Sequence, residues 1–201
     1  MSILWTLMRL TGKIGRKMYV IPQQRIIIND DYRDTDRILD LGGGGEGVIG
    51  QLRGSQVVAV DTREEELNGT PNGPQKVVAD ARALPFENGT FDAVTAFYFL
   101  MYLQPADYDE VFREAFRVLG QNGQMFIWDT RIPSIGTRTY SLFVVPVTAI
   151  LPHKKIHTAY GVQWKLREMS AERIIDSALR AGFTVVDKVE HEYAFSLILK
   201  K

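Results

Sequence analysis

The chain has 201 residues, of which 45% are hydrophobic and 24% are charged, the composition of one ordinary globular domain. Its formal net charge is zero and its pI is about 6.8, so no global charge favours binding to nucleic acid or to a membrane surface. The absence of cysteine excludes disulfides and thiolate metal sites, and no apolar run reaches the ~20 residues that a membrane-spanning helix needs. We therefore expect a single cytoplasmic domain over residues 1–201.

The N-terminal part of the chain is basic, and its first acid is Asp30. Apolar residues repeat there at helical spacing, at Ile3, Leu7, Leu10 and Ile14. This spacing predicts a helix over about the first 18 residues, and a short apolar piece follows at 26–28. We interpret residues 1–36 as an N-terminal helical lid whose basic side chains face solvent. A basic arm for an anionic substrate is the alternative.

Short runs of Val, Ile and Leu follow and alternate with helical and turn-forming stretches. Strands are predicted at 37–41, 57–61, 76–80, 91–99 and 124–130. Helices are predicted at 48–52, at 105–119, and from the capping residue Ser170 to Ala181. This alternation is typical of a parallel sheet with helices on both faces.

The last third of the chain has two contrasting parts. Residues 131–168 contain prolines, aromatic residues and two histidines, and we expect them to be irregular. The closing stretch TVVDKVEHEYAFSLILKK predicts two strands joined by a tight connection, which must be antiparallel. The predicted fold is thus α/β, with a doubly wound, mostly parallel seven-stranded sheet (Rossmann-like) that ends in a C-terminal antiparallel β-hairpin.

Four consecutive glycines, Gly42 to Gly45, follow the first predicted strand in the stretch RILDLGGGGEG. A tight turn needs only one or two glycines, so the run indicates a loop whose backbone N–H groups approach a ligand closely. In open α/β sheets, ligands bind at this carboxyl edge of the strands. We therefore predict a ligand site at the end of the first strand.

Two kinds of ligand suit such a loop. The G-x-G-x-x-G spacing of dinucleotide-binding proteins is present, at Gly42, Gly44 and Gly47. However, Asp40 beside the loop would repel a pyrophosphate, whereas it suits a ligand with an amino group and a sulfonium. Two further strands end in acid, so Asp61 can serve ribose hydroxyls and Asp80 the adenine amino group. These features favour S-adenosylmethionine over a dinucleotide.

From about Arg37 to the last strand, the chain resembles the class I S-adenosylmethionine-dependent methyltransferases, of the small-molecule type. ILDLGGGG resembles that family's first motif and VVAVD its second, while VVADARALPFENGTFDAV and FREAFRVLGQNGQMFIWD resemble the segments that lead to the fourth and fifth strands. The pattern departs from the family's in one of two ways: counted from Asp40, Glu46 stands where the family has its third glycine, whereas Gly43, Gly45 and Gly47 fit the glycines but displace the acid by one residue. The resemblance implies an S-adenosyl-L-methionine cofactor bound by Asp40, Gly42, Gly43, Gly44, Asp61, Thr62, Asp80, Ala81 and Phe97.

No catalytic residue stands out, and none is required if positioning of an activated methyl group supplies most of the rate. We expect a small-molecule acceptor, held by the N-terminal lid and by residues 131–168 as a substrate-side insertion. Candidate acceptor residues in that insertion are Tyr140, His153, His157, Tyr160 and Trp164. No metal site is predicted. The alternatives are an NAD(P)-dependent oxidoreductase and a non-catalytic S-adenosylmethionine-binding protein; nucleic acid as acceptor and the oligomeric state stay open.

Overall fold

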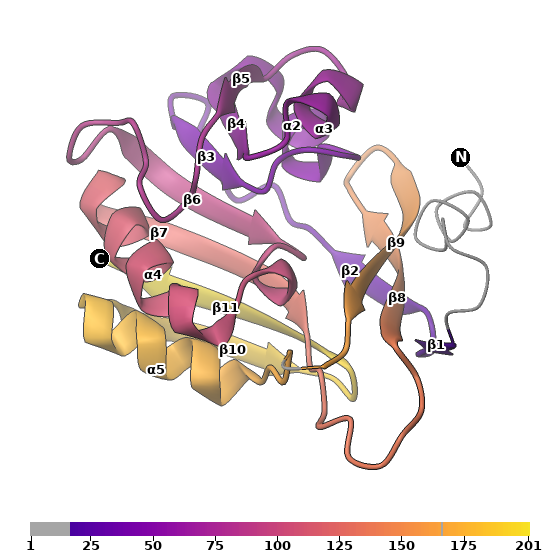
Figure 1. The fold of residues 1–201 in the computed structure, drawn as a ribbon. Helices are drawn as coiled ribbons and strands as arrows, with labels where there is room; N and C mark the ends of the chain where they lie inside the picture. Colours follow the sequence, from indigo (N-terminus) through magenta and orange to yellow (C-terminus); the bar gives the residue numbers. More distant parts are fainter. Residues whose placement is uncertain (1–16, 166) are drawn as a thin grey trace.

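The computed structural model describes residues 17–165 and 167–201, and its largest element is a seven-stranded sheet (Figure 1). Its strands are β3 (Ile38–Leu41), β4 (Val57–Asp61), β5 (Gln75–Val78), β6 (Phe91–Phe97), β7 (Leu119–Thr130), β10 (Thr184–Glu190) and β11 (Ala194–Lys200). They are ordered β10-β11-β7-β6-β3-β4-β5. The strands from β7 to β5 in this order are parallel, and β11 is antiparallel to both of its neighbours. The predicted mostly parallel sheet and its terminal hairpin are confirmed.

Helices lie on both faces of this sheet. They are α2 (Val48–Arg53), α3 (Glu64–Gly69), α4 (Tyr108–Val118) and α5 (Ala171–Ala181), with 3-10 turns η1 (Gly54–Gln56), η2 (Leu100–Tyr102) and η3 (Pro105–Asp107). The chain passes from β3 to β4 in one direction and from β6 to β7 in the other. Because such crossovers are right-handed, α2 and α4 lie on opposite faces. Figure 1 shows α4 and α5 side by side on one of them.

A second, four-stranded sheet, here called the cap sheet, was not predicted. It consists of β1 (Met18–Val20), β2 (Gln24–Ile27), β8 (Leu142–Ile150) and β9 (Lys155–Gln163). β1 and β2 follow one another along one edge of β8, and β9 pairs antiparallel along the other edge. The prediction that 131–168 is irregular was therefore wrong. Proline is uncommon in the interior of a strand, but β8 contains Pro146 and is fully buried from Leu142 to Ala149.

The N-terminal lid is also corrected in part. The helix predicted for the first residues lies outside the described part of the chain. The described remainder of 1–36 forms β1 and β2, so it contributes strands to the cap sheet rather than a helical lid. Both strands are only three or four residues long, and they gain their partner from β8, more than a hundred residues away in sequence. Nothing in their local pattern signals that pairing.

Two smaller differences concern element boundaries. Residues 120–123, between the predicted helix at 105–119 and the predicted strand at 124–130, belong to β7, where the pairing with β6 shifts register between Phe91 and Ala93. Asn122 adopts a left-handed φ of 63° in this stretch. The short helix α3 was not predicted, because NGTPNGP leaves little room for a crossover between β4 and β5.

The two sheets meet where the strand order reverses. The carboxyl ends of β3 and β6 lie side by side there, which is the position at which open α/β sheets bind ligands. The arrowheads of β6 and β7 in Figure 1 point toward β8 and β9 of the cap sheet. The fold thus encloses the predicted ligand site between the main sheet and the cap sheet.

Candidate functional site

A cavity of about 480 Å³ opens at this junction, within the range of small-molecule sites. All nine predicted cofactor residues line it: Asp40, Gly42, Gly43, Gly44, Asp61, Thr62, Asp80, Ala81 and Phe97. They come from the ends of four strands that the sequence separates by up to 57 positions (97 − 40). Their role in cofactor binding stays a prediction, but the fold brings all of them to one place.

The loop consists of glycines because neighbouring acidic residues leave no room for side chains on it. A Cβ atom on Gly43 would lie 2.8 Å from an Asp40 oxygen, and one on Gly44 would lie 2.7 Å from an Asp61 oxygen and 2.7 Å from the Cβ of Glu66. Real Cβ atoms do not make such contacts. Four glycines are needed in a row because the same backbone must turn and also pass close to the acids at the ends of β3 and β4.

The hydrogen bonds of this loop indicate which amides a ligand can use. The N–H of Gly43 donates to the Val60 carbonyl, and that of Gly45 donates to the Glu66 carbonyl, each at 3.0 Å. The N–H groups of Gly42, Gly44 and Glu46 have no acceptor among the described residues. These amides are therefore available to a bound molecule.

Asp40 is a buried carboxyl group at the end of β3. Its side chain accepts a hydrogen bond of 2.8 Å from the Thr95 hydroxyl, and the residue is 3% exposed. Burial raises its pKa from the usual 3.8 to about 7, with a further contribution from the negative charge of Asp61, while the Thr95 hydrogen bond opposes the rise. The charge of Asp40 therefore changes near neutral pH, and a cation nearby would favour its ionised form.

Asp61 and Glu66 are linked by Arg63, which also lines the cavity and forms an ion pair with each of them. The guanidinium group lies 3.1 Å from the Glu66 carboxylate and 3.9 Å from that of Asp61. Asp61 also accepts a 2.9 Å hydrogen bond from the Arg63 backbone N–H. Sequence patterns gave no signal for Arg63 or Glu66, because both lie past the motif that ends at Asp61.

Asp80 and Ala81 lie at the end of β5, on the same side of the cavity. Asp80 accepts hydrogen bonds from the backbone N–H and the guanidinium group of Arg82, at 2.9 and 2.7 Å. Those hydrogen bonds lower the pKa of Asp80 below its usual value. The Nε of Arg82 also donates to both carboxylate oxygens at 3.1 Å, but the Asp80 side chain is 40% exposed, so a ligand can still reach it. We call this side, with Asp40, Asp61, Glu66, Asp80 and the glycine loop, the acidic half.

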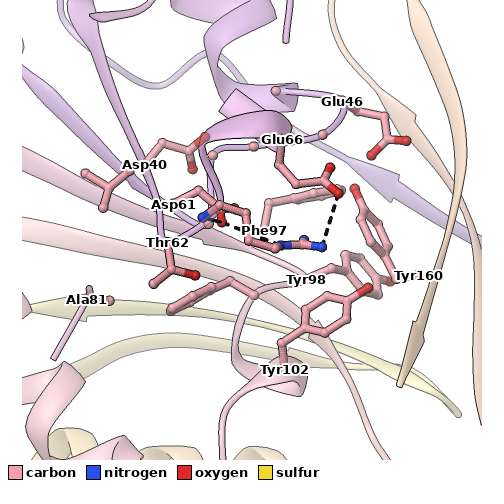
Figure 2. Close-up of a pocket in the computed structure, with 18 of the residues that line it drawn as sticks. Asp40, Glu46, Asp61, Thr62, Glu66, Ala81, Phe97, Tyr98, Tyr102 and Tyr160 are labelled. Atoms are coloured by element: carbon pink, nitrogen blue, oxygen red, sulfur yellow. Dashed lines mark hydrogen bonds and ion pairs between the residues drawn. The ribbon is translucent and has the colours of Figure 1, made fainter. Parts of the chain in front are cut away.

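The opposite side is lined by aromatic residues and is called the aromatic half. It consists of Phe97, Tyr98, Phe99 and Tyr102 after β6, and Tyr160 of the cap sheet. The Tyr98 and Tyr160 rings stack at 5.0 Å with an interplanar angle of 11°. Figure 2 shows Tyr98, Tyr102 and Tyr160 together, across the cavity from Asp40 and Thr62. Of the five acceptor candidates predicted in 131–168, Tyr160 alone lines this cavity.

The other four candidates have different surroundings. Tyr140 and Trp164 belong to an aromatic cluster around Tyr19, and the Trp164 indole donates to the Pro133 carbonyl at 2.7 Å. The His157 ring lies 3.0 Å from the Thr148 hydroxyl of the same sheet, and His153 is exposed in the connection between β8 and β9. Within residues 17–165 and 167–201, no group of three His, Asp or Glu side chains is placed to hold a metal ion.

Direct contacts join the cap sheet to the main sheet around the cavity. The Thr158 hydroxyl donates to the Glu46 carboxylate at 2.7 Å, and the Gly161 N–H donates to the Tyr102 hydroxyl at 3.2 Å. Glu46, the residue that departs from the glycine pattern, thus connects the loop to β9. At the position of Glu46, the difference from the glycine pattern therefore coincides with a contact between the glycine loop and the cap sheet.

A family model described as a methyltransferase domain matches residues 39–127. The demethylmenaquinone methyltransferase of Listeria monocytogenes serotype 4a is 29% identical over 154 residues, 74% of this chain and 64% of that protein. The demethylmenaquinone methyltransferase of Thermus thermophilus is 34% identical over 108 residues, 51% of this chain and 47% of that protein. The chain therefore spans less than two thirds of the length of these relatives.

Solved structures agree on the fold. A structure of an S-adenosylmethionine-dependent methyltransferase from Methanosarcina mazei superposes with a TM-score of 0.59 at 18% identity, covering 85% of this chain and 94% of that one. The matched segment 39–127 contains the glycine loop, both strand-end acids and the start of the aromatic half. The sequence match and the fold agree: residues 39–127 match a methyltransferase domain, and the chain has the fold of solved S-adenosylmethionine-dependent methyltransferases.

Proposed function

We propose that this protein transfers a methyl group from S-adenosylmethionine to a small molecule that carries an aromatic ring. The convergence on one cavity of the nine residues that the resemblance predicts for cofactor binding is the observation that supports this most strongly. The acidic half would hold the cofactor, and the aromatic half would hold the acceptor.

The acidic half suits a cationic ligand. Asp40, Asp61, Glu66 and Asp80 line the cavity, and Arg63 is the one basic side chain among its described lining residues. Two opposite charges about 4 Å apart attract by roughly 1–4 kcal/mol between water and a protein surface, and two like charges repel equally. A sulfonium and an amino group are therefore favoured here, and the pyrophosphate of a nicotinamide dinucleotide is disfavoured.

The bare glycine loop also suits this cofactor. The free N–H groups of Gly44 and Glu46 can donate to its carboxylate, Asp61 can accept from ribose hydroxyls, and Asp80 can accept from the adenine amino group. The cofactor supplies, when bound, a methyl group already activated by its sulfonium. The chain's own contribution is then to bind, to orient the acceptor and to exclude water, and such positioning is worth up to ~7–11 kcal/mol.

The acceptor is proposed from the aromatic half and from the relatives. Rings of Phe97, Tyr98 and Tyr160 meet at centroid distances of 5.0 to 6.2 Å and form a wall on which a planar ring can pack. The relatives are named for demethylmenaquinone, which makes its reduced form the first acceptor to test. A cytoplasmic location stays a prediction, and no described helix is long and apolar enough to cross a membrane.

The test is turnover of methyl-labelled cofactor with a short-chain reduced demethylmenaquinone. The proposal predicts label in the extracted quinone and formation of S-adenosylhomocysteine in equal amount. Binding of S-adenosylmethionine with no turnover on this acceptor or on a panel of hydroxylated aromatics would instead favour a non-catalytic binding protein. Binding of NAD alone would favour the oxidoreductase.

A further inference from the structure

The Tyr98 side chain carries a buried polar group that the proposed function has not yet used. Tyr98 is 1% exposed, and its hydroxyl group has no hydrogen-bond partner among the described residues. Buried hydroxyl groups are nearly always paired, because leaving one unpaired costs the full desolvation of the group. An unpaired hydroxyl at a cavity wall therefore calls for a partner that the bound molecule brings.

The backbone at Tyr98 is held in an uncommon conformation. Its φ is +50°, in the left-handed region, where a bulky residue is rarely found. Its N–H donates to the Trp128 carbonyl at 2.7 Å, which fixes the turn that ends β6. Such outliers persist where the surroundings impose them, and they cluster at binding sites. Here the strained turn directs the Tyr98 ring away from β6 and onto Tyr160 of the cap sheet.

The position of Tyr98 assigns it to the acceptor. The carboxylates and free loop amides lie on the acidic half, whereas Tyr98 is stacked on Tyr160 in the aromatic half. Burial keeps the pKa of the Tyr98 hydroxyl well above its ordinary value of 10, with a smaller effect of the charge of Asp129. The group therefore stays protonated at neutral pH, and it can donate a hydrogen bond but cannot serve as a general base.

We propose that Tyr98 determines acceptor specificity by donating a hydrogen bond to an oxygen atom on the acceptor's ring. This rests on the proposed function and narrows it: the acceptors are oxygen-bearing planar rings, such as quinols and phenols, rather than unsubstituted or purely hydrocarbon rings. A site built to pair a buried donor rejects analogues that lack the acceptor atom, because the donor is then left unpaired.

Two matched ring compounds test this assignment. 1,4-Naphthoquinone and naphthalene share one ring system, and only the first has oxygen atoms. The chain has no cysteine, so the quinone cannot be captured by a thiol. Affinities for both are measured by equilibrium titration in saturating S-adenosylhomocysteine, for the wild-type protein, for Tyr98→Phe and for Tyr32→Phe. Tyr32 is the matched control, because its hydroxyl is also buried and unpaired but lies outside the cavity lining.

The wild-type protein is expected to bind the quinone more tightly than naphthalene. Tyr98→Phe should weaken quinone binding about 3- to 10-fold, the equivalent of one neutral hydrogen bond, and leave naphthalene binding within twofold. Tyr32→Phe should change neither. The unfolding midpoint of ligand-free Tyr98→Phe should equal or exceed that of the wild type, because the substitution removes an unpaired buried group.

Three results would overturn the assignment: equal loss for both compounds in Tyr98→Phe, no loss for either, or no preference of the wild type for the quinone. Equal loss would mean that the ring only packs. No loss would mean that an ordered water alone satisfies the hydroxyl. The binding of S-adenosylhomocysteine is measured in the same titrations, so failure of the proposed function, seen as no binding of that compound by the wild type, is distinguished from failure at Tyr98.

Discussion

The acidic and aromatic halves of the cavity are assembled in different ways. The acidic half lies on one continuous stretch, from Asp40 to Ala81, and its residues lie at or just after the ends of β3, β4 and β5, except Glu66, which is in α3. The aromatic half combines the turn after β6 with β9, which pairs with β8 in a separate sheet. The first half is local in sequence, whereas the second depends on long-range pairing. The cofactor half of such a binding site can therefore be predicted from the sequence, whereas the acceptor half cannot.

The largest loss of cofactor affinity is expected from a substitution in the tightly packed glycine loop of the acidic half. Gly44→Ala would place a Cβ atom 2.7 Å from the Asp61 carboxylate and the Glu66 Cβ, so the loop must shift. Overpacking of this kind costs about 1–3 kcal/mol, and we expect S-adenosylmethionine affinity to fall about 10- to 100-fold by calorimetry. Gly69→Ala is the control, since its Cβ would meet nothing within 4 Å. Equal effects of the two substitutions would contradict the crowding argument.

A smaller loss is expected from Asp61→Asn, which keeps the shape of the side chain but removes its charge. We expect S-adenosylmethionine affinity to fall about tenfold, because hydrogen bonds to charged groups are worth ~1.5–3 kcal/mol and this site is partly solvated. Ring-compound affinity in the aromatic half should not change. Asp176→Asn, on the exposed face of α5, serves as control. An equal loss of ring-compound affinity would mean that the two halves do not bind their ligands independently.

The pH dependence of cofactor binding should follow Asp40. Its pKa of about 7 means that the carboxyl group gains its charge as the pH rises through neutrality. A cationic cofactor favours the charged form, so its affinity should rise about threefold between pH 6.5 and 7.5. Asp40→Asn should flatten this rise. Asp129→Asn should leave the rise unchanged, because Asp129 does not line the cavity. It is a matched control, since burial raises the pKa of Asp129 to about 7 as well.

The pH dependence of folding stability should have the opposite sign to that of cofactor affinity. The folded-state pKa of Asp40 lies above its unfolded value, so its contribution to stability is fully present below pH ~4 and is lost as the pH rises through about 7. Alkaline pH should thus tighten cofactor binding while it weakens the fold of the ligand-free protein. Unfolding midpoints and affinities that move in the same direction between pH 6 and 8 would contradict this account of Asp40.

The smallest effect is expected at the contact between the two sheets. Thr158→Val keeps the shape of the side chain and removes its hydrogen bond to Glu46. We expect the KM for the acceptor to rise about two- to threefold with cofactor affinity unchanged, the equivalent of a weak hydrogen bond. Thr148→Val is the control, because Thr148 lies in the same sheet but bonds Gln23 and His157, which do not line the cavity, whereas Glu46 does. A loss confined to cofactor binding would assign Glu46 to the acidic half alone.

The sequence could predict the main sheet because each of its elements carries a local signal. Val, Ile and Leu runs marked the buried strands, Ser170 and Gly182 marked the ends of α5, and the acids at strand ends marked the acidic half. All of these signals act over a few residues, which is the range over which spacing and capping are informative.

The cap sheet and Tyr98 could not be predicted for the same reason. β1 and β2 are too short to show alternation, and they become strands only because β8 offers a free edge. Tyr98 lies in AFYFLMYL, where the sequence singled out Phe97 for the cofactor and gave no signal for Tyr98. Its left-handed backbone and unpaired hydroxyl depend on packing between β6 and β9, which no single stretch of sequence contains.

One titration tests the assignment of the acidic half most directly. S-Adenosylmethionine and NAD are titrated separately into the wild-type protein and into the double variant Asp61→Asn, Asp80→Asn. We predict that the wild type binds S-adenosylmethionine and not NAD, and that the double variant loses at least about tenfold in S-adenosylmethionine affinity. Binding of NAD by the wild type, or unchanged S-adenosylmethionine affinity in the double variant, would contradict the account.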